Sequence, residues 1–172
     1  MSTSFLKAIL ILPGTVLVYI PAVLIWLSHG TSFEATLPPV YSIHALAGVV
    51  CGLVGFGLIV WTMRLFARSG GGGTPAPWDP IQNLIILGPY RHVRNPMLTG
   101  VIFVLAAEAL LLQSIPICLW MVLFFIVNTL YFAFVEEPKL EKRFGDAYRD
   151  YKNNVPRWLP RLTPYVGHKK HQ

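Results

Sequence analysis

Four long runs of apolar residues constrain this chain more than any other feature of its sequence. They cover about residues 5–27, 44–66, 97–112 and 116–135. A helix of about 20 apolar residues crosses the roughly 30 Å of hydrocarbon in a bilayer. A hydrophobic content of 54% and a charged content of 13% also depart from those of soluble proteins. The sequence therefore predicts an all-α integral membrane bundle of about four transmembrane helices, in a single domain of residues 1–172.

The first run differs from a secretory signal peptide. It continues to about Leu27 without a small-residue cleavage site, and three further runs follow it. We therefore interpret it as a retained span. Pro13 and Pro21 lie inside it, so we expect a kink or a locally satisfied break in its helix.

The basic residues predict how the spans are oriented. Lys7 lies at the start of the first run, four arginines lie at the end of the second run or between it and the third, and nine Lys or Arg follow the fourth. The connections 28–43 and 113–115 contain none. Because cytoplasmic loops are enriched in Lys and Arg, a multi-pass protein with both termini in the cytoplasm is predicted. The net charge of +6 thus indicates membrane lipids as partners and not nucleic acid. The sequence leaves the oligomeric state open.

Several features predict how the spans pack. Gly48, Gly52 and Gly55 form a stripe of small residues, which favours close approach of another helix over a groove for a cofactor. The connection of residues 113–115 is short enough to predict an antiparallel hairpin. Glu108 is either a functional intramembrane acid or a side chain that reaches the nearby interface. Asn128 is expected to hydrogen-bond a neighbouring helix.

A polar loop, residues 88–96, lies between the second and third runs. Pro89 and Pro96 prevent a continuous helix through it. Arg91, His92 and Arg94 make it cationic. Such a loop suits an anionic or strongly polarised small molecule, although arginines at this place can equally serve only to set topology.

After the fourth run the sequence becomes amphipathic. Glu136 and Glu137 precede Pro138, as in the first turn of a helix. Apolar residues then recur at helical spacing on one face, at Leu140, Phe144, Ala147, Tyr148 and Tyr151. We expect a cytoplasmic C-terminal amphipathic helix, within a cap of residues 136–161, that meets the polar loop.

The polar residues that can gather at this face exclude some chemistries. No Ser/His/Asp set and no Cys nucleophile beside a base is visible, and two glutamates with one histidine make a poor metal site, so no metal is expected. Cys51 and Cys118 lie inside predicted spans. Carboxylates and aromatic rings instead suit a cofactor with a ribose, an amine and a cation. The available aromatic walls are Trp78, Tyr148 and Trp158.

Two sequence blocks carry a resemblance to a known family. They are Gly88-Pro89-Tyr90-Arg91-His92-Val93-Arg94-Asn95-Pro96-Met97 and Glu136-Glu137-Pro138-x-Leu140-x-x-x-Phe144-Gly145-x-x-Tyr148-x-x-Tyr151-x-x-x-Val155-Pro156-Arg157. With the two spans between them they resemble the prokaryotic type of the isoprenylcysteine carboxyl methyltransferase family, over residues 88–161. The resemblance implies an integral enzyme of a bacterial inner (plasma) membrane. Such an enzyme transfers a methyl group from S-adenosylmethionine, in a cytoplasmic pocket, to a lipophilic acceptor that enters from the bilayer.

The resemblance also implies roles for individual residues within a cofactor-binding loop, residues 78–98, and the cap. The implied cofactor contacts are Gln82, Asn83, Leu84, Ile85, Tyr90, Asn95, Pro96, Met97, Leu98 and Glu136. The candidate catalytic residues are Glu136, Glu137, Arg94 and His92. A base is needed only for an amine or hydroxyl acceptor, and either glutamate or His92 would serve.

Two departures from the eukaryotic members of that family matter. Their Arg-His-Pro-x-Tyr motif reads Arg94-Asn95-Pro96-Met97-Leu98 here, so a histidine and a tyrosine are missing from the cofactor wall. Either His92 and Tyr90 take over part of that task or binding is weaker. Phe132 stands where those members carry a substrate-side arginine, so methylation of a prenylated protein's carboxylate is not predicted.

The predicted function is S-adenosylmethionine-dependent methyl transfer to a small hydrophobic or lipid-like acceptor at the cytoplasmic membrane face. The sulfonium already activates the methyl group, so the protein has mainly to align donor and acceptor and to exclude water. A nicotinamide-dependent isoprenoid or sterol reductase and a non-catalytic membrane scaffold are the alternatives. The cofactor that binds distinguishes the three.

Overall fold

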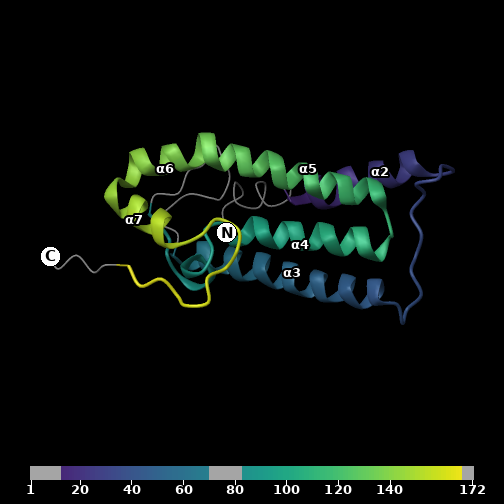
Figure 1. Ribbon diagram of the computed structural model, residues 1–172, viewed down its shortest axis with the longest axis horizontal. Helices are drawn as coiled ribbons and strands as arrows, with labels where there is room; N and C mark the ends of the chain where they lie inside the picture. Colours follow the sequence, from purple (N-terminus) through teal and green to yellow (C-terminus); the bar gives the residue numbers. More distant parts are fainter. Residues whose placement is uncertain (1–12, 70–82, 168–172) are drawn as a thin grey trace.

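The computed structural model describes residues 13–69 and 83–167, and these residues form helices and loops but no strand (Figure 1). In chain order the helical segments are η1 (Thr15–Tyr19), α2 (Ile20–Ser28), α3 (Ile43–Ser69), η2 (Gly88–Arg91), α4 (Pro96–Leu111), α5 (Ile115–Tyr131), η3 (Phe132–Glu136), α6 (Glu137–Phe144) and α7 (Asp146–Asn154). η1 and η3 are π-helical, and η2 is a 3₁₀ turn. The all-α prediction is confirmed for the described residues.

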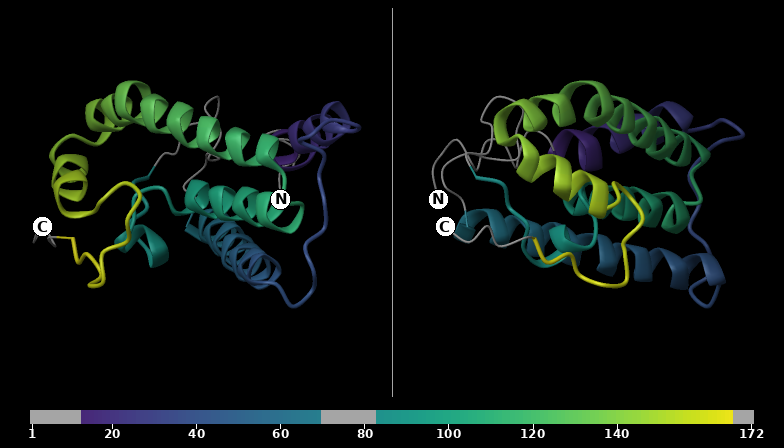
Figure 2. Two further views of the ribbon diagram at one scale, coloured as in Figure 1. Left: turned by 45° about the vertical axis from the view of Figure 1, so that its right-hand side comes forward. Right: turned by 60° about the vertical axis from the view of Figure 1, so that its left-hand side comes forward.

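The predicted hairpin joins α4 and α5. α4 ends at Leu111, Gln113 adopts a left-handed conformation with φ of 42°, and α5 begins at Ile115. The Ser114 side chain caps α5 by accepting a hydrogen bond from the Ile117 N–H at 3.4 Å. From this hairpin, α5 and α6 arch away from α4 (Figures 1 and 2).

The glycine stripe of α3 packs against α4 of the same chain. A Cβ added at Gly55 would lie 2.6 Å from the carbonyl oxygen of Gly100, and one added at Gly48 would lie 2.7 Å from the Leu111 side chain. Distances this short leave no room for a side chain between the two helices. The packing role predicted for the stripe is confirmed, and it is a contact within the chain.

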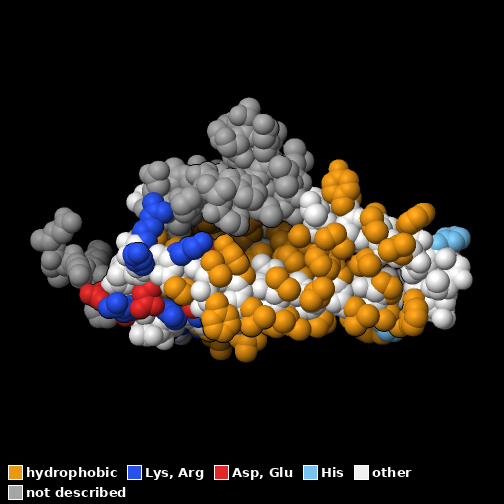
Figure 3. Space-filling model, turned by 90° about the horizontal axis from the view of Figure 1, so that it is seen from above, with side chains coloured by type: hydrophobic (Ala, Val, Ile, Leu, Met, Phe, Trp, Pro, Cys, Tyr) orange, Lys and Arg blue, Asp and Glu red, His pale blue; other side chains and the backbone are white. Residues whose placement is uncertain are grey.

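Two helical stretches are long and apolar enough to cross a membrane. They are Ile43–Phe66 and the continuous helix Ile115–Phe144, which joins α5, η3 and α6. Thr15–Ser28 and Pro96–Leu111 are apolar but shorter, and the start of the first predicted span lies outside the described residues. Figure 3 shows apolar side chains over most of the molecule's length and charged ones gathered near one end. These features support a helical membrane protein, and the count of four spans stays a prediction.

The expected break in the first span is the π-helical turn η1, directly before Pro21. The Ile20 N–H bonds the carbonyl oxygen of Thr15, five residues earlier. Pro21 has no N–H to donate. The carbonyl oxygen of Val16 instead accepts a hydrogen bond from Trp120 Nε1 of α5 at 3.1 Å. The break thus attaches this helix to α5.

The predicted start of a separate helix at Glu136 is wrong. The fourth span continues through η3 into α6 without interruption. The Glu137 N–H bonds the carbonyl oxygen of Phe132, five residues earlier, and this wide π turn accommodates Pro138 where a regular α-helical turn would clash. The proline therefore marks a change of helical register and not a helix start.

The amphipathic segment is also two helices where one was expected. Gly145 has a φ of 56°, a left-handed conformation that suits glycine, and it separates α6 from α7. Tyr148 and Tyr151 are buried as predicted, at 3% exposure each. Ala147 is exposed, because the chain changes direction just before it.

Candidate functional site

The C-terminal segment returns to the polar loop and pairs with its backbone (Figure 1). Three hydrogen bonds of 2.9–3.0 Å join them, from Arg94 N–H to Pro156 O, from Arg161 N–H to His92 O, and from Tyr165 N–H to Arg91 O. The order of these bonds shows that residues 156–165, here called the strap, run antiparallel to the loop. The structure thus brings together the two blocks that the sequence analysis singled out.

Two loop side chains reinforce the pairing. His92 Nδ1 lies 2.8 Å from the carbonyl oxygen of Arg161, and Arg91 Nε donates to the carbonyl oxygen of Tyr165 at 2.7 Å. Since a carbonyl only accepts, the Nδ1 of His92 must carry a proton. In the neutral imidazole, Nε2 is then left as the acceptor.

An aromatic cluster lies between the loop and the C-terminal helices. Its buried members are Tyr148, Tyr151, Val155 and Tyr165. The Tyr151 hydroxyl donates to the carbonyl oxygen of Tyr90 at 2.7 Å, and the Tyr90 ring packs edge-on against Phe66 of α3 at 5.9 Å. Burial raises the pKa of Tyr148 to about 12 and also raises the pKa of Tyr151, so both hydroxyls are protonated near neutral pH.

Glu137 is 2% exposed and lies among basic residues. Its Oε1 accepts hydrogen bonds from Arg94 Nη1 at 2.7 Å and from Arg157 Nε at 2.8 Å. Lys152 Nζ lies 3.5 Å from its Oε2. The residue follows the apolar part of its helix, which ends at Val135. Burial opposes ionisation, but the two guanidinium groups outweigh it and hold the pKa of this carboxyl below its usual range.

Glu136 has different surroundings from its neighbour. Its Oε2 accepts a hydrogen bond from the Tyr131 hydroxyl at 3.3 Å, and the residue is half-buried. The two glutamates predicted to act at one site therefore have separate partners. Glu137 joins the loop and the strap, whereas Glu136 bonds back to its own helix.

The predicted cofactor residues 95–98 form the N-terminus of α4. Asn95 is 9% exposed, and its Nδ2 has no hydrogen-bond partner among the described residues. Its side chain does not cap the helix. An unpaired buried polar group costs about 1–3 kcal/mol, and the first N–H groups of a helix also lack partners within the helix. This end of α4 therefore offers hydrogen-bond donors to a ligand.

The remaining cofactor residues of the prediction are only partly described. Residues 83–85 precede the polar loop without regular structure, and Ile85 is buried among them. Leu84 packs against the aromatic cluster. Gln82 and Trp78 lie outside the described residues.

The strap residues Arg157 and Trp158 reach α5, a contact that sequence reasoning missed. Arg157 Nη1 donates to the carbonyl oxygen of Thr129 at 3.4 Å, and the Trp158 ring lies 5.0 Å from that of Phe125. Trp158 Nε1 is buried without a hydrogen-bond partner in the described part of the chain. The sequence motif ends at Arg157 but carries no signal for this contact, because the contact depends on the return of the strap in space.

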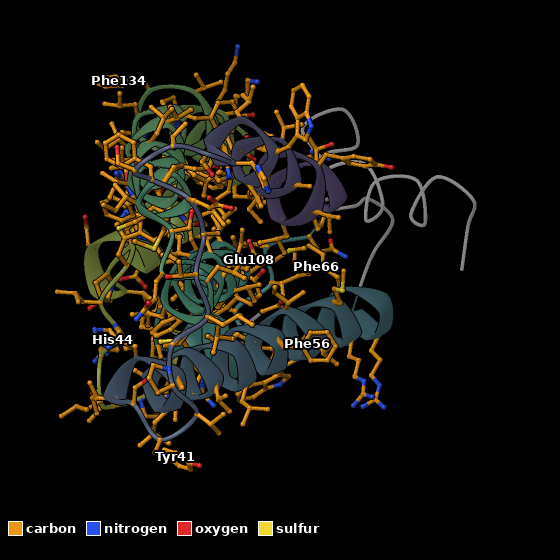
Figure 4. All side chains as sticks on the ribbon, turned by 90° about the vertical axis from the view of Figure 1, so that its right-hand side faces the viewer. Tyr41, His44, Phe56, Phe66, Glu108 and Phe134 are labelled. Carbon is orange, nitrogen blue, oxygen red and sulfur yellow. The ribbon has the colours of Figure 1, made fainter. Side chains whose placement is uncertain are left out.

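Glu108 and Asn128, the two residues that the sequence analysis singled out in the last two predicted spans, do not join this site. Figure 4 places Glu108 in the interior of the bundle, and its Oε2 is buried without a partner within residues 13–69 and 83–167. Asn128 Nδ2 donates to the carbonyl oxygen of Phe124 in its own helix at 2.8 Å. The prediction that Asn128 bonds a neighbouring helix is therefore wrong, since a closer backbone acceptor satisfies it.

Apolar helices with a donor-rich polar cap at one end define a helical membrane protein with a candidate site for a polar ligand. The family model of the phospholipid methyltransferases matches residues 43–147, more than half of the sequence, and the chain belongs to this family. It is a family of membrane methyltransferases that includes the isoprenylcysteine type, so the resemblance carried by the two sequence blocks is confirmed. No curated protein matches the chain in a direct sequence comparison.

Proposed function

We propose that the protein transfers a methyl group from S-adenosylmethionine to a small hydrophobic or lipid-like acceptor at the cytoplasmic face of the membrane. Membership of a methyltransferase family supports the reaction type. The observation that carries the cofactor assignment is the unpaired, buried amide of Asn95 at the N-terminus of α4. S-adenosylmethionine has carboxylate and ribose oxygens that accept hydrogen bonds from such donors. The residues present therefore fit this cofactor.

The proposed cofactor contacts are Gln82, Asn83, Leu84, Ile85, Tyr90, Asn95, Pro96, Met97, Leu98 and Glu136. Bound there, the cofactor supplies a methyl group on a positively charged sulfur, so no side chain has to activate it. The chain's own part is to hold donor and acceptor in line and to exclude water. The strap and the aromatic cluster cover the loop and serve the second task.

Two of the four candidate catalytic residues suit a direct role. Neutral His92 has a free acceptor position at Nε2, because Nδ1–H is used by the strap. Glu136 has its carboxylate outside the basic cluster. Either can accept the proton of an amine or hydroxyl acceptor. Glu137 and Arg94 bond each other, and we propose that they are positioning residues that hold the strap against the loop.

We also propose a single domain with four spans and both termini in the cytoplasm of a bacterial inner membrane. The absence of Lys and Arg from residues 28–43 and 113–115 supports this orientation. Charged side chains gather near the end of the molecule where loop and strap meet (Figure 3). A membrane-surface site can then receive a soluble cofactor and an acceptor from the bilayer.

Cofactor binding by the detergent-purified protein tests the proposal. Calorimetry is performed with S-adenosylmethionine, its demethylated product and NADPH. We expect the first two to bind and the Asn95→Ala variant to bind them at least about tenfold more weakly, because a hydrogen bond to a charged group contributes about 1.5–3 kcal/mol. Glu136→Ala is expected to weaken binding as well.

Asn153→Ala is the matched control, since Asn153 is an exposed asparagine of α7. It should bind the cofactor like the wild type. Binding of NADPH in place of S-adenosylmethionine would favour a reductase, and binding of neither would favour a scaffold. Both results would overturn the methyltransferase proposal, although family membership favours methyl transfer over both.

A further inference from the structure

We propose that the outer side of the strap, formed by Leu159, Leu162 and Val166, inserts into the surface layer of the bilayer, and that this contact holds the strap on the polar loop. Three observations carry the proposal. They are the exposure of these side chains, the depth of the strap along α3, and the apolar surface that the strap continues. The proposal concerns the membrane and does not depend on which cofactor or acceptor the protein binds.

The strap has an inner and an outer side. On the inner side, the N–H groups of Arg161 and Tyr165 donate to the polar loop, and the Tyr165 side chain is buried at 7% exposure. Leu159, Leu162 and Val166 are instead 80%, 97% and 72% exposed. Leu162 thus has almost no contact with the rest of the described chain. A group of exposed apolar side chains marks a surface that meets a partner or a membrane.

Three prolines keep this outer side open. Pro156, Pro160 and Pro164 recur at every fourth position of the strap, and all three are exposed. A proline fixes its own φ and disfavours helical geometry in the residue before it, so the strap stays extended. The leucines therefore cannot turn inward by forming a helix. The proline rings add further apolar surface beside them.

The contacts of the polar loop set the depth of the strap. A Cβ added at Gly88 would lie 2.7 Å from the Leu65 side chain and 3.4 Å from the Trp61 side chain. The Tyr90 ring packs on Phe66, where the membrane-length apolar stretch of α3 ends. The loop thus lies beside the last turns of that stretch and not beyond them. Because the strap pairs with the loop, it lies at the same depth, and Figure 1 shows it in yellow level with the end of α3.

The strap also continues an apolar surface of the bundle. Trp61 and Leu87, which flank the start of the polar loop, are 52% and 51% exposed. The stretch Ile43–Phe66 is only 17% buried inside the chain, so lipid surrounds most of it. Tryptophan is enriched where the headgroups meet the acyl chains. The bilayer is therefore the partner that already lies at the depth of the strap.

The composition of the strap favours insertion over attraction by charge. Between Leu159 and Val166 the only charged residue is Arg161, whose guanidinium donates to the Asn154 carbonyl oxygen and the Thr163 hydroxyl. Binding at a membrane surface strengthens with the apolar area that is buried. We therefore expect the contact to form with uncharged phosphatidylcholine as well as with anionic lipid.

A fluorescent probe on the strap tests the insertion. The nitrobenzoxadiazole probe is attached to Leu162→Cys in a chain whose own cysteines are removed by Cys51→Ala and Cys118→Ala, and the protein is placed in phosphatidylcholine nanodiscs. Lipids that carry a nitroxide near the headgroup should quench this probe. The control is Asp146→Cys, at an 83% exposed side chain in the turn between α6 and α7, and its probe should stay bright. Quenching at position 162 that does not exceed quenching at position 146 overturns the proposal.

Hydrogen exchange tests whether the membrane holds the strap. In nanodiscs, the amides of Arg161 and Tyr165 should exchange about tenfold or more faster in the double variant Leu159→Ser/Leu162→Ser, a factor that corresponds to the burial of roughly one leucine. Since both side chains are exposed, the variant loses little packing within the chain. Leu37→Ser, at an 80% exposed leucine in the connection before α3, is the matched control and should leave these amides unchanged. Wild-type exchange rates in the double variant overturn the proposal.

Both measurements are made without S-adenosylmethionine, so they separate this proposal from the proposed function. Failure of the cofactor to bind would overturn the function and leave the membrane contact standing. An unquenched probe would instead overturn the membrane contact, assign the outer side of the strap to a protein partner, and leave the function intact.

Discussion

Replacing Glu137 with glutamine is expected to lower the unfolding temperature strongly. The carboxylate is 2% exposed and accepts hydrogen bonds from Arg94 and Arg157. Glutamine keeps the shape but removes the charge, so the two guanidinium groups lose their shared counter-ion. Removing one partner of a buried ion pair costs about 3–5 kcal/mol. For a chain of this size, each 1 kcal/mol shifts the unfolding temperature by about 2–4 °C, so we expect a decrease of about 6–20 °C.

Glu141→Gln is the matched control for this experiment. Glu141 lies one turn later on α6 and pairs with Arg149 at 2.8 Å, but both side chains are accessible to water. Exposed ion pairs contribute little, so this variant should unfold close to the wild-type temperature. The assay is the fraction of monodisperse protein left after heating in detergent for a fixed time, since unfolding of such proteins is often irreversible. Equal shifts for the two variants, or an unshifted Glu137→Gln, would refute the reasoning.

Three further results are expected. The folded-state pKa of Glu137 is lowered, so the stabilisation by its carboxylate is complete above the unfolded pKa of about 4.3 and is lost as the pH falls through the folded value. Acid unfolding curves of wild type and Glu137→Gln should therefore differ at neutral pH and converge only as the pH falls through that folded value. Gly55→Ala should lower the unfolding temperature, because the added Cβ would lie 2.6 Å from the backbone carbonyl oxygen of Gly100. Gly57→Ala is the control: with no described neighbour within 4 Å, it should be neutral or stabilise the protein by up to about 1 kcal/mol. Tyr151→Phe removes the hydroxyl that donates to the backbone carbonyl oxygen of Tyr90, so the free energy of unfolding should fall by about 1 kcal/mol and amide hydrogen exchange in the polar loop should become faster. Unchanged exchange would contradict the idea that Tyr151 holds the loop in place.

The apolar runs, the hairpin and the glycine contact could be predicted because each depends on local sequence. Gly48 and Gly55 are separated by two helical turns, so any helix through them presents both to the same neighbour. Pro138 shows the limit of such reasoning. A proline normally indicates a helix boundary. Here the π turn η3 shifts the backbone hydrogen bonds before Pro138 from a four-residue to a five-residue spacing, and the helix continues through the proline. The sequence carries no local signal for that wide turn.

The candidate site could be predicted in outline but not in its contacts. The polar loop and the C-terminal block both stand out in the sequence, and the structure pairs them. Adjacent glutamates cannot be told apart by sequence, however, and only the structure shows that Glu137 meets Arg94 whereas Glu136 meets Tyr131. Arg157 reaches Thr129 from 28 residues away, which no motif spacing encodes. Long-range electrostatic contacts therefore account for most of what the sequence missed.

The strap connects the polar loop with the fourth predicted span. Its backbone covers the polar loop, where the cofactor is proposed to bind, through the hydrogen bonds at Arg91, His92 and Arg94. Its side chains Arg157 and Trp158 contact α5. A cofactor that binds the loop beneath the strap also stabilises the strap against the loop, because any ligand that binds the ordered form favours it. Cofactor binding would then help to exclude water from the loop before the methyl group is transferred.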